Sequence, residues 1–138
     1  MMRSTSQCLV VALTVLLFLA LGVASTLADA NRQEVRIAIK ARAFQPAEVT
    51  VQAGHEVVLR FENHDVEIHA FVPEKWLERV PVQVDGSGAP FFGDKGLTRL
   101  LIPGGGQATL RFVPRIPGRY RYRCDLPGHQ MVGHIRVE

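Results

Sequence analysis

The chain is poor in sulfur-containing residues. Only Cys8 and Cys124 are cysteines among its 138 residues, which excludes the dense disulfide framework of many small secreted proteins. Apart from Met1 and Met2 at the start, the only methionine is Met131. Any chemistry that needs sulfur in the C-terminal part of the chain therefore depends on Cys124 and Met131.

Long apolar runs are also lacking. An uncharged run of 15 residues, 9–23, follows Arg3, whereas a membrane-spanning helix needs about 20 apolar residues. Small residues come next and end in Ala28-Asp29-Ala30, and this combination is typical of a secretory signal peptide. We expect residues 1–30 to be a signal peptide, cleaved after Ala28 or Ala30. Residues 31–138 then form one periplasmic or otherwise extracytoplasmic domain that retains no membrane span.

Cleavage would leave Cys124 without a cysteine partner in a compartment where cysteines usually pair. Such a thiol is an oxidation liability, a bridge between two copies, or a residue kept for metal or redox chemistry. The formal net charge is only +3, and charges of both signs are interspersed. The sequence therefore shows no field that predicts a nucleic-acid partner.

Short runs of alternating apolar and polar residues dominate the chain from Glu34 onward. Val35, Ile37 and Ile39 alternate with polar or small residues, as expected for strands with one buried face. Similar runs recur at 49–51, 56–62, 68–72, 98–102, 108–113, 119–124 and 131–137. The pattern predicts an all-β, Greek-key sandwich of seven to eight strands, with a loop or short helix inserted at about 73–97. Within that insertion, a helical turn or two is expected over 74–80, between Pro73 and Pro81.

The segment 124–131 concentrates the residues that carry chemistry. Cys124, His129 and Met131 follow a strand in which Tyr120 and Tyr122 share the parity of the cysteine. Thiolate and thioether sulfur select reduced copper, and imidazole suits both of its oxidation states. Two histidines, one cysteine and a weak axial methionine form the known electron-transfer geometry. The segment therefore predicts a copper site that needs one more histidine.

The segment resembles the ligand loop of the cupredoxins, the family of plastocyanin, azurin and amicyanin. The resemblance also covers the segments 44–54, 61–71 and 117–124, and so most of 34–138. It implies a cupredoxin fold that holds one copper ion through His69, Cys124, His129 and Met131. It further implies that His129 lies near the surface as the electron port.

Two departures from the family pattern leave alternatives open. Only Gln130 separates His129 from Met131, so either Met131 or His134 can be the axial ligand. Position 70 is alanine, where many family members have a hydrogen-bonding residue such as asparagine. The site type, blue or otherwise, therefore stays open.

The function expected from these residues is that of an exported one-electron carrier with redox partner proteins. The alternative is a periplasmic copper-handling protein, a chaperone or resistance factor, with copper-trafficking partners. An enzyme is not expected, because related copper enzymes need a second copper centre and further domains. We expect a monomer.

The remaining histidines and the glycine cluster are expected to have ordinary structural roles. His55 follows a glycine turn, and His64 lies in a polar loop, so both are expected to be solvated turn residues. The cluster Gly104-Gly105-Gly106 lacks the lysine of a phosphate-binding loop and predicts a hairpin turn.

Overall fold

The computed structural model describes residues 31–138, and the signal peptide expected at 1–30 lies outside the described residues. Residues Gln33–Glu138 form one compact unit. Within residues 31–138 the structure contains no helix, and so none that could cross a bilayer. Its strands are β1 (Arg32–Lys40), β2 (Ala43–Gln45), β3 (Glu48–Val51), β4 (Glu56–Asn63), β5 (His69–Phe71), β6 (Gln83–Gly86), β7 (Ala89–Gly93), β8 (Gly96–Ile102), β9 (Gln107–Phe112), β10 (Gly118–Arg123) and β11 (Val132–Val137).

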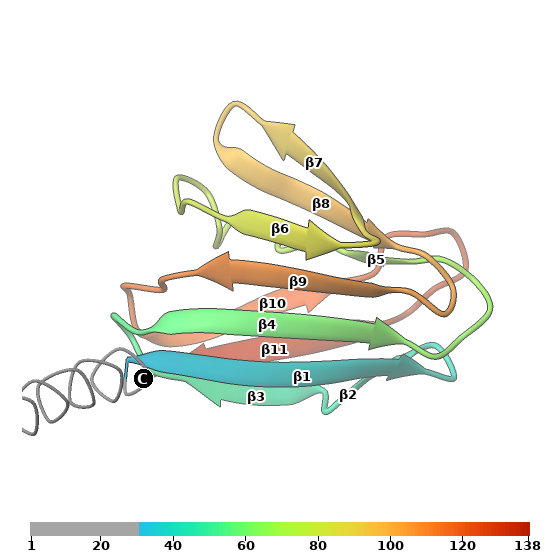
Figure 1. Ribbon diagram of the computed structural model, residues 1–138, viewed down its shortest axis with the longest axis horizontal. Helices are drawn as coiled ribbons and strands as arrows, with labels where there is room; N and C mark the ends of the chain where they lie inside the picture. Colours follow the sequence, from blue (N-terminus) through green and yellow to red (C-terminus); the bar gives the residue numbers. More distant parts are fainter. Residues whose placement is uncertain (1–30) are drawn as a thin grey trace, which may run out of the picture. The chain divides into compact units, whose positions relative to one another are not determined.

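The strands form three sheets. A five-stranded sheet has the order β2-β1-β4-β9-β6, and two three-stranded sheets have the orders β10-β11-β3 and β5-β8-β7. Figure 1 shows β1, β4 and β9 in front of β10, β11 and β3. A β-bridge between Val72 and Arg123 brings the end of β5 to the end of β10. The all-β sandwich expected from the alternating pattern is confirmed.

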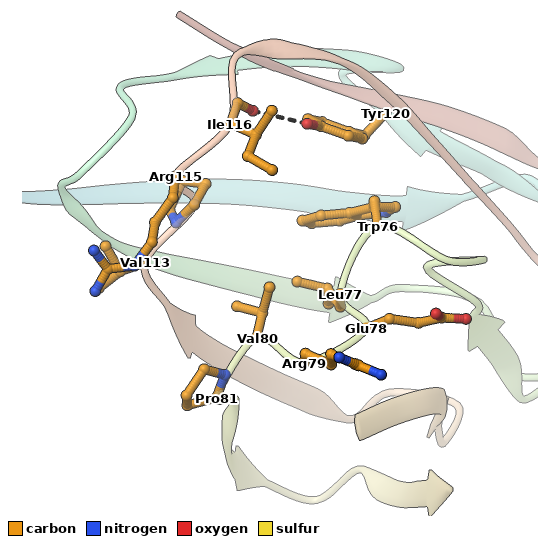
Figure 2. Close-up of a pocket in the computed structure, with 11 residues that line it drawn as sticks. Trp76, Leu77, Glu78, Arg79, Val80, Pro81, Val113, Arg115, Ile116 and Tyr120 are labelled. Atoms are coloured by element: carbon orange, nitrogen blue, oxygen red, sulfur yellow. Dashed lines mark hydrogen bonds between the residues drawn. The ribbon is translucent and has the colours of Figure 1, made fainter. Parts of the chain in front are cut away.

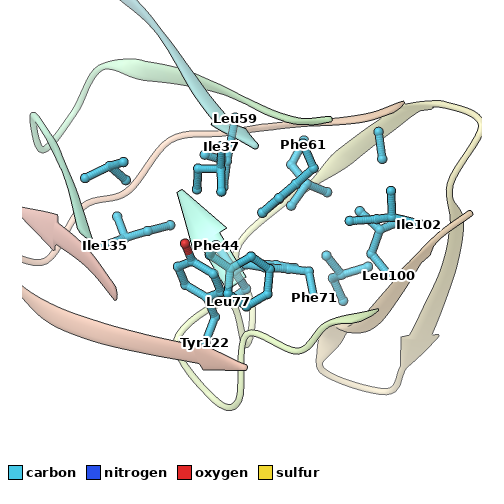
Figure 3. Packing of buried hydrophobic residues seen from close by; sticks show 14 of the residues in the cluster. Ile37, Phe44, Leu59, Phe61, Phe71, Leu77, Leu100, Ile102, Tyr122 and Ile135 are labelled. Carbon is cyan, nitrogen blue, oxygen red and sulfur yellow. The ribbon is translucent and has the colours of Figure 1, made fainter. Parts of the chain in front are cut away.

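The core fills the space between these sheets. Tyr122 of β10 makes ring contacts with Phe44 at 4.9 Å, Phe71 at 5.1 Å and Phe61 at 6.3 Å between centroids. Figure 3 shows these rings together with Ile37 and other buried aliphatic side chains. Aromatic clusters of this size contribute both buried area and favourable edge-to-face contacts. They hold β10, which leads to Cys124, against β4.

The insertion at 73–97 differs from the expectation in two ways. The short helix predicted over 74–80 is wrong: these residues form turns, with positive φ at Glu74 and Arg79. The N–H of Arg79 donates to the carbonyl of Lys95, which lies outside the segment, at 2.6 Å. Left-handed backbone and a bond to a distant carbonyl both prevent a continuous helix.

The insertion also carries β6 and β7, and the short strand β2 was not predicted either, so residues 31–138 contain eleven strands rather than seven or eight. All five residues of β7 are exposed, as are three of the four in β6. Strands this exposed have little need for alternation, because only Val84 of β6 packs against the core. The alternating pattern therefore did not predict β6 and β7.

The two tyrosines of β10 provide a test of the packing. Tyr122 is fully buried, and its hydroxyl finds no hydrogen-bond partner among residues 31–138. The hydroxyl of Tyr120 instead donates to the carbonyl of Ile116 at 2.7 Å. We expect Tyr122→Phe to raise the free energy of unfolding by about 1 kcal/mol, and Tyr120→Phe to lower it by about 1 kcal/mol. Equilibrium denaturation of both variants measures the difference, and a loss of stability in Tyr122→Phe would contradict this description of the core.

Candidate metal centre

Two neighbouring strand ends bring His69 and Cys124 together. His69 begins β5, and Cys124 comes directly after β10. The bridge between these strands pairs Val72 with Arg123 through two backbone hydrogen bonds of 2.9 and 3.2 Å. The bridge therefore fixes His69 beside Cys124, although the two residues are far apart in the sequence.

The loop after Cys124 turns His129 back toward the cysteine. The N–H of Cys124 donates to the carbonyl of Met131 at 3.0 Å, which closes the loop. Inside it, the N–H of His129 donates to the carbonyl of Leu126, also at 3.0 Å. Gly128 has a φ of 78°, a left-handed conformation that glycine adopts without strain. The short loop thus depends on this glycine to direct His129 inward.

Three donor atoms converge as a result. Nδ1 of His69 lies 3.2 Å from Nδ1 of His129, which lies 3.4 Å from Sγ of Cys124. Metal–nitrogen bonds of about 2.0 Å and metal–sulfur bonds of about 2.3 Å place donors on one tetrahedral ion about 3.3–3.6 Å apart. The separation of 3.4 Å lies within that range, and the separation of 3.2 Å lies just below it. The donor set of two imidazoles and one thiolate suits copper, so these three side chains could hold a copper ion.

The cluster is shielded from solvent. His69 is 0% exposed and Cys124 is 3% exposed, and the side chain of His129 is 8% exposed. The backbone N–H of Ala70 donates to Sγ of Cys124 at 3.3 Å. A backbone amide therefore supports the sulfur, although position 70 offers no polar side chain.

Two carboxylates lie behind the histidine rings, and the sequence argument missed both. Oδ2 of Asp65 is 2.9 Å from Nε2 of His69, and Oε2 of Glu67 is 3.5 Å from Nε2 of His129. Glu67 also forms a two-pronged ion pair with the guanidinium of Arg42, with one contact of 2.8 Å. Both acids lie within four residues of His69 in the sequence. That closeness was the only feature of the sequence that could have indicated contact with the metal centre.

Hydrogen bonds keep both carboxylates ionised. The N–H of Arg42 is the largest cause that lowers the pKa of Asp65, and the N–H of Ala41 and the ring of His69 act in the same direction. The guanidinium of Arg42 lowers the pKa of Glu67. Partial burial opposes both shifts without cancelling them. Two negative charges therefore face the outer ring nitrogens of the two histidines.

Asn63 organises the segment that carries these acids. It is 3% exposed, and its Nδ2 lies 2.9–3.1 Å from the carbonyl oxygens of Glu67, Ile102 and Pro103. Its Oδ1 accepts from the N–H of Asp65 at 3.0 Å. One buried amide thus ties the loop before His69 to the turn between β8 and β9.

The other residues considered from the sequence lie as follows. Met131 is buried, and its role as the axial ligand stays a prediction. His134 lies on β11 in register with Arg121 and Glu48, and its flanking residues, not its own ring, face the core. Within residues 31–138, two groups of side chains could hold a metal ion, namely His69-Cys124-His129 and Asp65-Glu67-His69, and neither contains His134, His55 or His64. A turn is present at 104–106, where the N–H of Gly106 donates to the carbonyl of Pro103 at 2.9 Å. The expected hairpin is wrong, because the flanking strands β8 and β9 belong to different sheets.

A cavity of about 270 Å³ lies near the start of β10, whereas Cys124 follows its end. Figure 2 shows Trp76, Val80, Ile116 and Tyr120 around it. The rings of Trp76 and Tyr120 stack at 5.6 Å between centroids. None of its lining residues belongs to the cluster of His69, Cys124 and His129. The cavity and the candidate metal centre are therefore separate features.

Comparison with known proteins agrees with the fold. The model of the cupredoxin-like domain family matches residues 10–137, and the chain therefore belongs to the cupredoxin-like family. No curated protein matches the chain.

Several solved structures are similar. Auracyanin A, a "blue" copper protein from Chloroflexus aurantiacus, is 22% identical with a TM-score of 0.56, over 78% of this chain and 99% of that one. Reduced auracyanin from Roseiflexus castenholzii is 22% identical with a TM-score of 0.56, over 76% and 96% of the two chains. Amicyanin from Paracoccus versutus is 20% identical with a TM-score of 0.51, over 77% and 82%. At these identities the similarity concerns the fold.

Proposed function

We propose that the chain is an exported mononuclear copper protein that carries single electrons, with His69, Cys124, His129 and Met131 as the ligands. The observation that carries the proposal is the convergence of three donor atoms: Nδ1 of His129 lies 3.2 Å from Nδ1 of His69 and 3.4 Å from Sγ of Cys124. The blue copper proteins among the similar structures support it. Bound copper would supply a one-electron couple between Cu(I) and Cu(II).

The surroundings of the site favour electron transfer over ligand exchange. Backbone or carboxylate groups hold each donor residue: Ala70 contacts the sulfur, Asp65 contacts His69, and the carbonyl of Leu126 binds the N–H of His129. Donors fixed in this way need little movement when the charge of the ion changes. A small rearrangement means a low barrier to electron transfer.

A redox partner would dock where His129 comes nearest to the surface. Pro127 and Gly128 beside it are exposed, and Glu67, which contacts its ring, lies between Val66 at 101% and Ile68 at 43% exposure. Exposed apolar residues around a buried redox centre are suited to brief contacts with another protein. We propose redox proteins as the partners and a monomer as the resting state.

Copper handling is the second candidate function. It is motivated by the single residue between His129 and Met131, which departs from the spacing of azurin-like loops. A chaperone or resistance factor would hold Cu(I) tightly, exchange electrons slowly and pass its metal to copper-trafficking proteins. The absence of a polar side chain at position 70 also favoured copper handling, but the backbone N–H of Ala70 still donates to Sγ of Cys124, which weakens that argument.

Spectra and voltammetry of one copper-loaded sample distinguish these candidates. For the carrier we expect intense thiolate-to-copper absorption in the visible and a reversible couple with fast electron exchange. A colourless Cu(II) protein, or a couple too slow to be reversible, would contradict the carrier and favour copper handling. Turnover of nitrite or phenols would contradict both, since neither candidate is an enzyme.

Export is proposed from residues 1–30 alone. N-terminal sequencing of the protein recovered from the extracytoplasmic fraction should begin after Ala28 or Ala30. Recovery of the intact chain from the cytoplasm would contradict it.

A further inference from the structure

Asp65 faces His69 on the side away from the other donor atoms. Its Oδ2 lies 2.9 Å from Nε2, whereas Nδ1 of the same ring faces Nδ1 of His129 at 3.2 Å. A neutral imidazole that binds a metal through one nitrogen carries its proton on the other. The carboxylate is therefore placed to accept that proton in a hydrogen bond.

The carboxylate is itself held in place by a different part of the chain. Its Oδ1 accepts from the N–H of Ala41 at 2.8 Å, and its Oδ2 accepts from the N–H of Arg42 at 3.0 Å. Ala41 and Arg42 form the turn between β1 and β2, and both have positive φ, at 53° and 57°. Both residues thus have a left-handed backbone conformation that is rare for residues other than glycine. In this conformation both N–H groups point at Asp65.

We propose that Asp65 is a positioning residue of the copper site, which keeps the His69 proton on Nε2, directs the Nδ1 lone pair to the metal and favours Cu(II) over Cu(I). The inference rests on the proposed function. A carboxylate bonded to the outer nitrogen of a ligand histidine fixes its tautomer and raises its basicity. A negative charge on the far side of the imidazole ring stabilises Cu(II) more than Cu(I), because Cu(II) carries the larger positive charge.

Glu67 does not have an equivalent role. Its carboxylate lies 3.5 Å from Nε2 of His129, beyond a normal hydrogen bond. It is also paired with the guanidinium of Arg42, which offsets its charge. The two acids therefore differ in two respects. Asp65 hydrogen-bonds to a histidine ring and is held mainly by backbone N–H groups, whereas Glu67 makes no such bond and is held by a guanidinium.

The test compares Asp65→Asn with Glu67→Gln and Asp85→Asn by voltammetry of the copper-loaded proteins. Asp85 lies on β6, forms an ion pair with Arg111 of β9 and touches neither histidine. We expect Asp65→Asn to change the ratio of Cu(II) to Cu(I) affinity by about tenfold or more in favour of Cu(I). That change raises the potential by about 59 mV per factor of ten. We expect a less than about threefold change for Asp85→Asn. Glu67→Gln removes the same charge without breaking a hydrogen bond to a ring, and its change should be smaller than that of Asp65→Asn. Asp65→Glu should restore most of the wild-type ratio.

A second measurement needs no variant. Long-range ¹H–¹⁵N NMR of wild-type protein in the diamagnetic Cu(I) form should show the His69 proton on Nε2. A proton on Nδ1, a potential of Asp65→Asn equal to that of Asp85→Asn, or a second copper ion held by Asp65, Glu67 and His69 would each overturn the inference. If the wild-type protein binds copper but gives no reversible couple, the proposed function fails. The NMR result then decides the inference by itself.

Discussion

Replacing Cys124 with serine will abolish the visible absorption of the Cu(II) protein. The band requires a sulfur-to-copper bond, and a serine hydroxyl is a hard ligand that stays protonated at neutral pH. Sγ of Cys124 is also one of the three converging donor atoms. Loss of a residue that only hydrogen-bonds to a metal ligand typically lowers metal affinity by roughly 10–100-fold. We expect the loss of a ligand atom itself to lower the Cu(I) affinity by more than that. Absorption spectroscopy and competition with a Cu(I) chelator measure the two effects.

His134→Ala is the matched control for this variant. His134 is the rival axial ligand suggested by the sequence, but its backbone pairs with the outer residues Arg121 and Glu48. We expect its removal to leave the spectrum unchanged, whereas Met131→Leu should shift it. A spectrum that responds to His134→Ala and not to Met131→Leu would exchange the roles of these two residues.

Replacing Asn63 with alanine will destabilise the apoprotein by about 2–4 kcal/mol. The change removes the amide that contacts the carbonyls of Glu67, Ile102 and Pro103 and that accepts from Asp65. Buried groups left without partners cost about 1–3 kcal/mol each, and partial relaxation recovers some of that cost. Equilibrium unfolding in urea measures the loss.

The same variant should weaken the metal site. Asn63 fixes the loop that carries Asp65, and loss of such outer support typically reduces metal affinity by about 10–100-fold. Gln130→Ala provides the control, because it removes an exposed amide from the loop between His129 and Met131. We expect it to change stability by less than about 0.5 kcal/mol. Equal stabilities of the two variants would show that the buried amide does not organise this segment.

Alternation along the chain predicted the strands that pack on the core. Ile37 and Ile39 in β1, and Tyr122 in β10, are buried as their parity requires. The same argument placed Cys124 on the inner side, and it is buried. Alternation works here because one face of each strand is covered, so that exchanging the two faces would expose the apolar side chains.

The outer environment of the site could not be predicted in the same way. Asn63, Asp65 and His64 form a polar run that is typical of a solvated turn, yet Asn63 is buried and Asp65 contacts His69. The contacts that decide this outcome join residue 63 to residues 102 and 103, and residue 65 to residues 41 and 42. Such long-range hydrogen bonds leave no periodic signal in the sequence.

The most direct test of the copper site is a crystal structure of the copper-loaded protein with the metal located by its anomalous scattering. We expect one ion, bonded to Nδ1 of His69, Nδ1 of His129 and Sγ of Cys124. An ion held instead by Asp65, Glu67 and Nε2 of His69, with Cys124 unbonded, would contradict the site and the function proposed from it.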